Sequence, residues 1–117
     1  MDESQALGAF AALSQPTRLA IVRLLVRAGA GGIAAGAVAG EVGVSASNVS
    51  FHLKELERAG LIAARREARS IVYSASYDTL SDLIGFLMKD CCGGRQEICA
   101  PVLADRFCTP ARRKRSA

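Results

Sequence analysis

The sequence predicts a mainly α-helical domain with one small β-hairpin, the arrangement of a winged helix-turn-helix. Three observations support this fold class. A glycine separates two short helical segments near residue 43, a stretch rich in β-branched and aromatic residues follows them, and apolar residues recur at helical spacing on both sides. We expect this domain to occupy residues 1–90, and a cysteine-containing segment with a basic tail to occupy residues 91–117.

Two helices are predicted before the helix-turn-helix. The first covers about thirteen residues with a frayed start, and its apolar positions are Ala6, Phe10 and Leu13. Ser14 is expected to end this helix and to cap the second, which has Pro16 in its first turn. The second helix should run to the glycines of residues 29–32, and its apolar stripe should comprise Leu19, Val22, Leu25 and Val26.

The helix-turn-helix itself is predicted from its end signals. Residues 35–42 form a short helix of small side chains, and Gly43 suits the left-handed position that ends it. Ser45 is a suitable N-cap for a second helix that runs to about Ala59, where Gly60 ends it in the same way. The face of this second helix that should pack inward carries Val49, Leu53 and Leu56.

The opposite face of the second helix is polar, cationic and partly aromatic, and we expect it to bind DNA. An outward phenylalanine suits contact with thymine methyl groups in a major groove. The alternative for Phe51 is packing at the edge of the core. The predicted DNA-binding residues on this helix are Ser47, Asn48, Ser50, Phe51 and Lys54.

A two-stranded wing is predicted from residues 61–66 and 70–75, with Glu67, Ala68 and Arg69 between the strands. Cations near the tip of such a hairpin can reach phosphates or an adjacent minor groove. The alternative is an ordinary solvated turn, because surface hairpins are commonly charged. The predicted DNA-binding residues of the wing are Arg65, Arg66 and Arg69.

A final helix beyond Tyr77 is predicted from a strong apolar stripe that consists of Leu80, Leu83, Ile84 and Leu87. Little sequence follows that could cover this face. We therefore expect the N- and C-terminal helices to form the interface of a homodimer, the alternative being that the last helix closes the monomer core.

The charge and the location of the protein follow from composition. The formal charge is +4, but four of the fifteen basic groups lie in residues 112–115, so any DNA-binding footprint elsewhere must be local. The acidic start does not resemble a secretory signal, and no apolar stretch reaches the roughly 20 residues that span a bilayer. These features predict a cytoplasmic protein without a membrane partner, whose basic tail adds salt-sensitive attraction to DNA.

Residues 50–62, Ser-Phe-His-Leu-Lys-Glu-Leu-Glu-Arg-Ala-Gly-Leu-Ile, resemble the ArsR/SmtB family of metal- and metalloid-responsive repressors. The similarity covers roughly residues 6–90 and includes Pro-Thr-Arg-Leu at 16–19. It implies a homodimeric winged-helix protein that binds double-stranded operator DNA and leaves it when a ligand binds. Relatives often have glycine where this chain has Ala68, so the wing turn should be of a different type or less tight.

The single histidine, His52, falls in the predicted recognition helix, where we expect a structural role with the ring partly packed. One histidine supplies no evident acid-base arrangement, so we expect neither an enzyme nor a catalytic cofactor.

Two ligand sites known in the family are missing from this chain. Many of its arsenic sensors carry Cys-x-Cys-x-x-Cys at the start of the helix-turn-helix, where residues 36–40 contain no cysteine. Its zinc sensors use Asp and His along the C-terminal helix, where this chain has no histidine.

The four cysteines of this chain instead follow the last predicted helix. Two adjacent cysteines precede two glycines, and a third lies downstream, which resembles an arsenic-responsive subgroup with a C-terminal Cys-Cys and a later Cys. Thiolates are soft donors, and As(III) or Sb(III) in pyramidal geometry needs three of them. Lys89 and Arg95 would favour the thiolate form. The predicted ligands are Cys91, Cys92 and Cys99.

The predicted function is an arsenite- or antimonite-responsive repressor that binds its operator as a dimer and dissociates when three thiolates capture the metalloid. Three alternatives keep the fold: a tetrahedral zinc or cadmium site that adds Cys108, a thiol redox switch, and a tail without a ligand. A thiol enzyme would need an acid-base set that the sequence does not offer.

Overall fold

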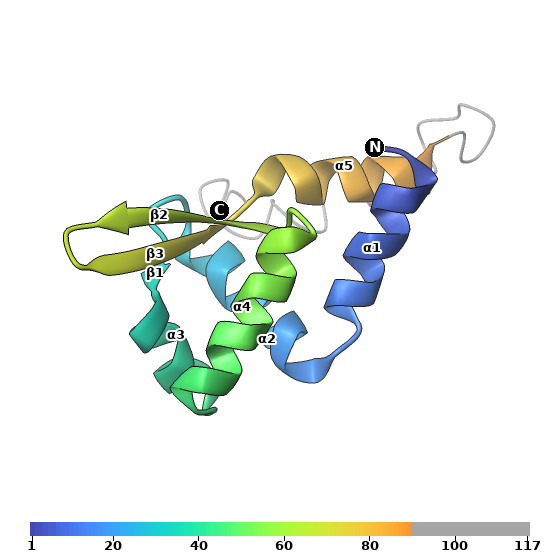
Figure 1. The fold of residues 1–117 in the computed structure, drawn as a ribbon. Coiled ribbons are helices and arrows are strands. Elements are labelled where there is room, and N and C mark those ends of the chain that lie inside the picture. The colour runs from blue at the N-terminus through green and yellow to red at the C-terminus, as the bar shows by residue number, and fades with distance from the viewer. Residues whose placement is uncertain (90–117) are drawn as a thin grey trace, which may run out of the picture. The chain divides into compact units, whose positions relative to one another are not determined.

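The computed structural model describes residues 1–89, and the predicted segment 91–117 with its four cysteines lies outside them. Residues Met1–Phe86 form one compact unit. The predicted fold class is confirmed, since the described part is mainly helical with a small antiparallel hairpin (Figure 1). Its elements are α1 Glu3–Leu13, α2 Pro16–Ala28, β1 Ile33–Ala34, α3 Ala35–Val42, α4 Ala46–Arg58, β2 Ile62–Glu67, β3 Ser70–Ala75 and α5 Tyr77–Met88.

Helix α1 begins with a capping box, so the predicted frayed start is wrong. The Asp2 carboxylate accepts a hydrogen bond from the Gln5 backbone N–H at 2.8 Å, and the Gln5 side chain accepts one from the Asp2 N–H at 2.8 Å. Both bonds satisfy N–H groups that a helix start otherwise leaves without partners. The buried side chains of α1 are small, which allows close packing on α2 and α4, and they are Ala6, Ala9 and Ala12.

The N-cap of α2 is Gln15, whereas the sequence had indicated Ser14. The Gln15 side chain accepts a hydrogen bond from the Arg18 N–H at 2.9 Å, whereas the Ser14 hydroxyl donates to Ala11 of α1 at 3.0 Å. The reason is local, because Gln15 precedes Pro16 and the proline ring favours the extended backbone that an N-cap needs.

The buried arc of α2 is also rotated from the predicted stripe. Leu19 is 46% exposed and Val26 is 40% exposed, although both were expected to pack inward. Strand β3 and the helices α1, α3 and α4 pack against α2. The side chains that this packing buries are Ile21, Val22 and Leu25.

Helices α3 and α4 form the predicted helix-turn-helix. Gly43 and Gly60 have the expected positive φ, +74° and +81°, and the Ser45 hydroxyl caps α4 by accepting from the Asn48 N–H at 3.2 Å. A cap of this kind stabilises a helix by about 1 kcal/mol. The predicted inward residues of α4 are each at most 1% exposed, namely Val49, Leu53 and Leu56.

The wing is part of a three-stranded antiparallel sheet in the order β1-β3-β2. Tyr73 of β3 lies opposite Ala64 of β2 and Ile33 of β1. The sequence did not predict β1, because two residues are too short to show an alternating pattern. Gly32 lets β1 approach, since a Cβ there would lie 2.5 Å from the Tyr73 carbonyl oxygen.

The wing turn contains only Ala68 and Arg69, because Glu67 still pairs with Ser70. Ala68 has a φ of +55°, and it is the non-glycine residue with positive φ in the part of the chain that the structure describes. The sequence had indicated either a different turn type or a less tight turn, and the second possibility is wrong because the turn has only two residues. A different turn type is present, since a type I′ turn would need positive φ at both residues.

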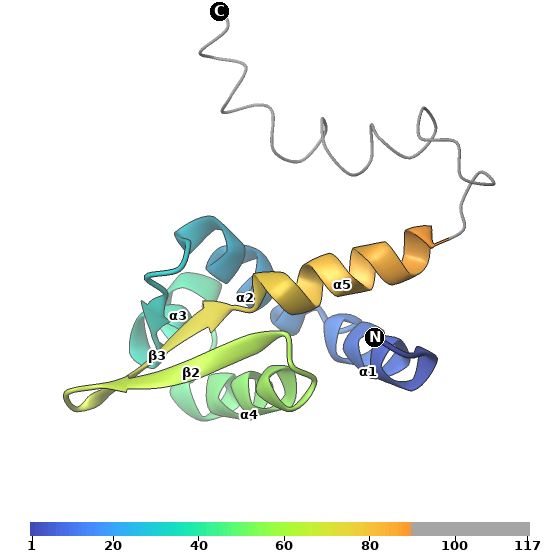
Figure 2. The ribbon, with the colours of Figure 1, turned by 90° about the horizontal axis from the view of Figure 1, so that it is seen from above.

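Helix α5 buries one side and exposes another. Leu83 is 4% exposed and helps to close the core, but Ile84 is 39% exposed and Leu87 is 59% exposed. The Tyr77 hydroxyl at the start of α5 donates to the Val26 carbonyl at 2.9 Å and joins α5 to α2. Figure 2 shows α5 continuing from the end of β3 and extending away from the tip of the hairpin.

No single helix of residues 1–89 has the length and apolar character to cross a membrane, although the sharply bent pair α1 and α2 together meets a test of length and composition.

Candidate nucleic-acid interface

The exposed face of α4 contains all five side chains that the sequence assigned to it. Helical periodicity opposes this face to the buried one, so each of these side chains is exposed to solvent. Phe51 is 58% exposed, and the alternative of packing at the edge of the core is therefore wrong. The five residues are Ser47, Asn48, Ser50, Phe51 and Lys54.

His52 lies at the border between the buried and exposed faces of α4, as expected. Its ring is half-buried and meets Phe51 edge to face, with centroids 5.5 Å apart and planes at 65°. Its Nδ1 atom lies 3.3 Å from Nη1 of Arg18. The sequence did not indicate Arg18 as a partner of α4, because Arg18 and His52 are 34 positions apart.

The three wing arginines divide into two groups. Nε of Arg65 donates to the Glu67 carboxylate at 2.6 Å, and its Nη2 donates to the Gly31 carbonyl at 2.7 Å. Arg66 and Arg69 are exposed, and neither makes a hydrogen bond or an ion pair within residues 1–89. Two wing cations are therefore available to a phosphate, whereas Arg65 is engaged within the protein.

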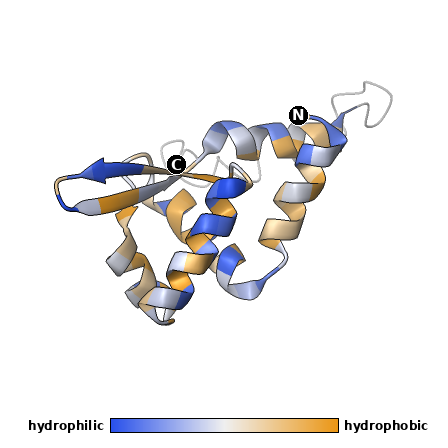
Figure 3. Cartoon of the chain, in the orientation of Figure 1, coloured by the Kyte–Doolittle hydropathy of each residue, from blue (hydrophilic) through white to orange (hydrophobic). Residues whose placement is uncertain are grey.

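Hydropathy differs between the predicted DNA-binding elements and α1. In Figure 3 the far end of the hairpin and several turns of α4 are hydrophilic, whereas α1 is mostly hydrophobic after its first turn. At the end of α4, Arg58 forms an ion pair with Glu55 at 3.1 Å. This pair is largely exposed, so it stabilises the helix by at most about 1 kcal/mol.

Tyr73 supports the wing from inside the sheet. Burial raises the pKa of its hydroxyl above the ordinary value of 10.0, and the carboxylate of Glu57 raises that pKa further. The hydroxyl therefore stays protonated and uncharged at neutral pH.

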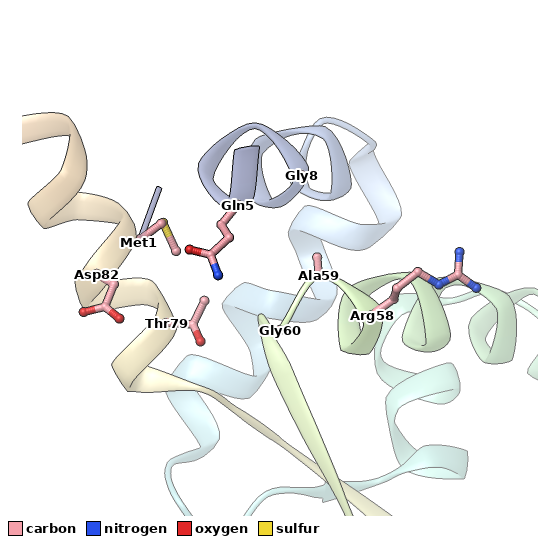
Figure 4. Close-up of a pocket in the computed structure, with 8 residues that line it drawn as sticks. All are labelled: Met1, Gln5, Gly8, Arg58, Ala59, Gly60, Thr79 and Asp82. Atoms are coloured by element: carbon pink, nitrogen blue, oxygen red, sulfur yellow. The ribbon is translucent and has the colours of Figure 1, made fainter. Parts of the chain in front are cut away.

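A hollow of about 520 Å³ lies between α1, the end of α4 and the start of α5 (Figure 4). It offers one guanidinium and one carboxylate but none of the predicted site residues. Within residues 1–89 no three His, Cys, Asp or Glu side chains gather as metal ligands would. The lining residues include Met1, Gln5, Gly8, Arg58, Thr79 and Asp82.

The predicted ligands for a metalloid lie outside the described residues. These are Cys91, Cys92 and Cys99, together with Cys108 of the four-cysteine alternative.

Known proteins resemble this chain in both sequence and structure. A family model described as a helix-turn-helix domain matches residues 13–65. The nodulation protein NolR of Rhizobium meliloti is 38% identical over 86 residues, which are 74% of this chain and 68% of NolR. An ArsR-like transcriptional regulator from Rhodococcus sp. RHA1 has a TM-score of 0.66 and 26% identity, over 86% of this chain and 93% of that one. The chain belongs to the ArsR family.

As an ArsR-family regulator, the protein is a DNA-binding transcriptional regulator and not an enzyme. Two further structures are informative. A homodimeric winged helix-turn-helix DNA-binding domain from Mycobacterium bovis has a TM-score of 0.61 and 29% identity, over 74% of this chain and 81% of its own. A possible transcriptional regulator for arsenical resistance has a TM-score of 0.57 and 29% identity, over 65% of this chain and 76% of its own.

Proposed function

We propose that this ArsR-family regulator is an arsenite- or antimonite-responsive repressor. It binds an operator as a homodimer and leaves the DNA when Cys91, Cys92 and Cys99 capture As(III) or Sb(III). The observation that carries the DNA-binding half is the exposed face of α4 beside a wing with two available arginines. The arsenical-resistance regulator with the same fold supports the ligand half.

On the operator, α4 of each subunit enters a major groove, and the two grooves are about one helical turn apart. Phe51 contacts thymine methyl groups, and the polar side chains around it contact base edges and phosphates. Arg66 and Arg69 of the wing contact the DNA backbone. This arrangement needs two subunits in a defined relative orientation.

The homodimer forms through α1 and α5, which expose large apolar side chains. Leu7 of α1 is 60% exposed, and Ile84 of α5 is 39% exposed. Apolar side chains exposed together on terminal helices are typical of an interface that another subunit covers. The homodimeric domain from Mycobacterium bovis supports the same assembly. We place this DNA-binding protein in the cytoplasm.

The ligand site uses cysteines that all follow α5 in the sequence. Three thiolates complete the pyramidal coordination of As(III), and soft sulfur donors prefer such soft ions. A ligand bound next to a dimer helix changes how the subunits pack, and such coupling typically amounts to about 1–3 kcal/mol. That range corresponds to roughly 5- to 150-fold weaker operator binding.

The test is an operator-retention assay on the reduced full-length protein, with arsenite added at increasing concentration. The Cys91→Ser/Cys92→Ser variant should stay on the DNA at arsenite concentrations that release the wild type. The matched control is Cys108→Ser, which should release normally. If the double variant still released DNA like the wild type, the sensing assignment would be wrong.

The same variants separate the alternatives. A tetrahedral zinc or cadmium site would require Cys108, so Cys108→Ser would then lose its response to those ions. A redox switch would release DNA with peroxide and show no response to arsenite.

A further inference from the structure

Arg18 joins three helices at one point of the fold. Its backbone N–H is held by the Gln15 side chain at 2.9 Å, and its Nε donates to the Ala12 carbonyl at the end of α1 at 2.6 Å. Its Nη1 reaches His52 of α4 at 3.3 Å. Helices α1, α2 and α4 pack against one another pairwise, and Figure 1 shows the short connection that leads from α1 into α2.

The chemistry of the two groups fixes the direction of this contact. A guanidinium is always charged and only donates, so Nδ1 of His52 must accept and the ring proton must be on Nε2. The guanidinium is also planar, and its N–H groups point in fixed directions. The bond to Ala12 therefore determines where Arg18 presents Nη1, and with it the position of the His52 ring.

The contact continues from His52 to the exposed face of α4. The His52 and Phe51 rings meet edge to face, an arrangement that aromatic pairs favour. Phe51 has more than half of its surface in solvent, and within residues 1–89 the His52 ring is the aromatic ring that it contacts. The line of contacts therefore runs from the Ala12 carbonyl in the last turn of α1 through Arg18 and His52 to Phe51.

We propose that Arg18 is a positioning residue for DNA reading, which sets the His52 and Phe51 rings relative to the end of α1. The proposal rests on the proposed contact between Phe51 and DNA. If α1 forms part of the dimer interface, a change in subunit packing moves the Ala12 carbonyl and reaches Phe51 by this route. Arg18 itself does not touch the DNA.

A purely structural role makes a different prediction. An arginine that only ties α1 to α4 would, when replaced, lower stability and weaken binding to every DNA sequence alike. A positioning residue lowers the preference for specific over nonspecific DNA, and its effect depends on the ring that it positions. Variants of Arg18, His52 and Phe51 therefore separate the two roles.

The experiment uses the full-length protein and two duplexes of equal length at one salt concentration. One duplex is enriched from a random pool by the wild-type protein, and the other is a scrambled version of it. We expect Phe51→Ala and Arg18→Gln each to lower the ratio of specific to nonspecific affinity about 3- to 10-fold, and the double variant to lose no more than Phe51→Ala alone.

Two further variants guard against a folding defect. His52→Leu keeps the bond between Arg18 and Ala12 but removes the acceptor, and should reproduce the loss seen in Arg18→Gln. His52→Gln keeps an acceptor and should recover part of the ratio. Arg18→Lys retains the charge but not the two-pronged geometry, and should not recover it.

The outcomes are distinct. Additive losses in the double variant, or equal losses on both duplexes, would overturn the positioning role. If Phe51→Ala lowers the ratio while His52→Leu leaves it unchanged in a folded protein, only the role of Arg18 fails. If Phe51→Ala leaves the ratio unchanged, the proposed DNA contact and this inference fail together, while arsenite release from DNA tests the sensing proposal separately.

Discussion

The guanidinium of Arg65 donates a hydrogen bond to the carbonyl oxygen of Gly31 at 2.7 Å and ties the wing to the loop after α2. The same side chain bonds Glu67 at 2.6 Å on its own strand. A bond between a cation and a main-chain carbonyl is stronger than a neutral one and is directional. Arg65 therefore sets the position of the wing, whereas Arg66 and Arg69 extend into solvent.

This division predicts different salt behaviour for two adjacent arginines. Arg66→Gln removes one phosphate contact and should reduce the slope of log affinity against log salt by about 1. Arg65→Gln should weaken operator binding through a less ordered wing while leaving that slope nearly unchanged. Binding measured across a salt series checks both, and equal slopes for the two variants would contradict the division.

Gly32 and Gly43 should respond differently to alanine although both have positive φ. At Gly43 a Cβ meets nothing within 4 Å, so Gly43→Ala should cost only the backbone strain of about 1–2 kcal/mol. At Gly32 the Cβ would lie 2.5 Å from the Tyr73 carbonyl oxygen and 2.8 Å from the Val72 side chain. In denaturant titrations, Gly32→Ala should therefore lower the free energy of unfolding by more than Gly43→Ala does. Equal losses in the two variants would show that β1 can shift away from β3 at little cost.

Two positions on opposite faces of α4 should separate stability from DNA binding. Leu53 is 1% exposed, so Leu53→Ala should lower the free energy of unfolding by about 2–5 kcal/mol. Phe51→Ala removes an exposed ring and should change that free energy by about 0.5 kcal/mol or less. Thermal or chemical unfolding measures both. A large loss of stability in Phe51→Ala would mean that the ring packs against the core.

Tyr73 predicts a loss of stability at alkaline pH. Its folded-state pKa is raised, so the protonated hydroxyl favours the folded state, and this contribution is complete below the ordinary value of 10.0. The contribution is lost as the pH rises through 10.0 toward the folded-state value. Tyr73→Phe should therefore lose less stability than the wild type between about pH 9 and pH 11.

The control for this alkaline effect is the same comparison below about pH 8, where the Tyr73 hydroxyl is protonated in the folded and unfolded states and both proteins should show the same slope. Melting temperatures recorded across the alkaline range make the comparison. The same slope in Tyr73→Phe and wild type would show that the alkaline loss has another source.

Several features of the fold could be predicted from the sequence because their causes are local. Ser45 and Gly60 mark the two ends of α4, and the spacing of Val49, Leu53 and Leu56 identifies its buried face. The hairpin follows from alternation and from residue types that favour strands. These signals depend on neighbours within a few residues, so they are present before any helix packs.

The tertiary structure decided what depends on partners far along the chain. It rotated the buried arc of α2 because β3 and the helices α1, α3 and α4 pack against it, and it added β1, whose two residues pair with β3. It also gave Arg65 and Arg66 different surroundings, although both lie on β2: Arg65 bonds Glu67 and Gly31, whereas Arg66 is exposed. Which cation is free and which is engaged depends on whether a carbonyl oxygen lies within reach, and the Gly31 oxygen is brought there only by folding.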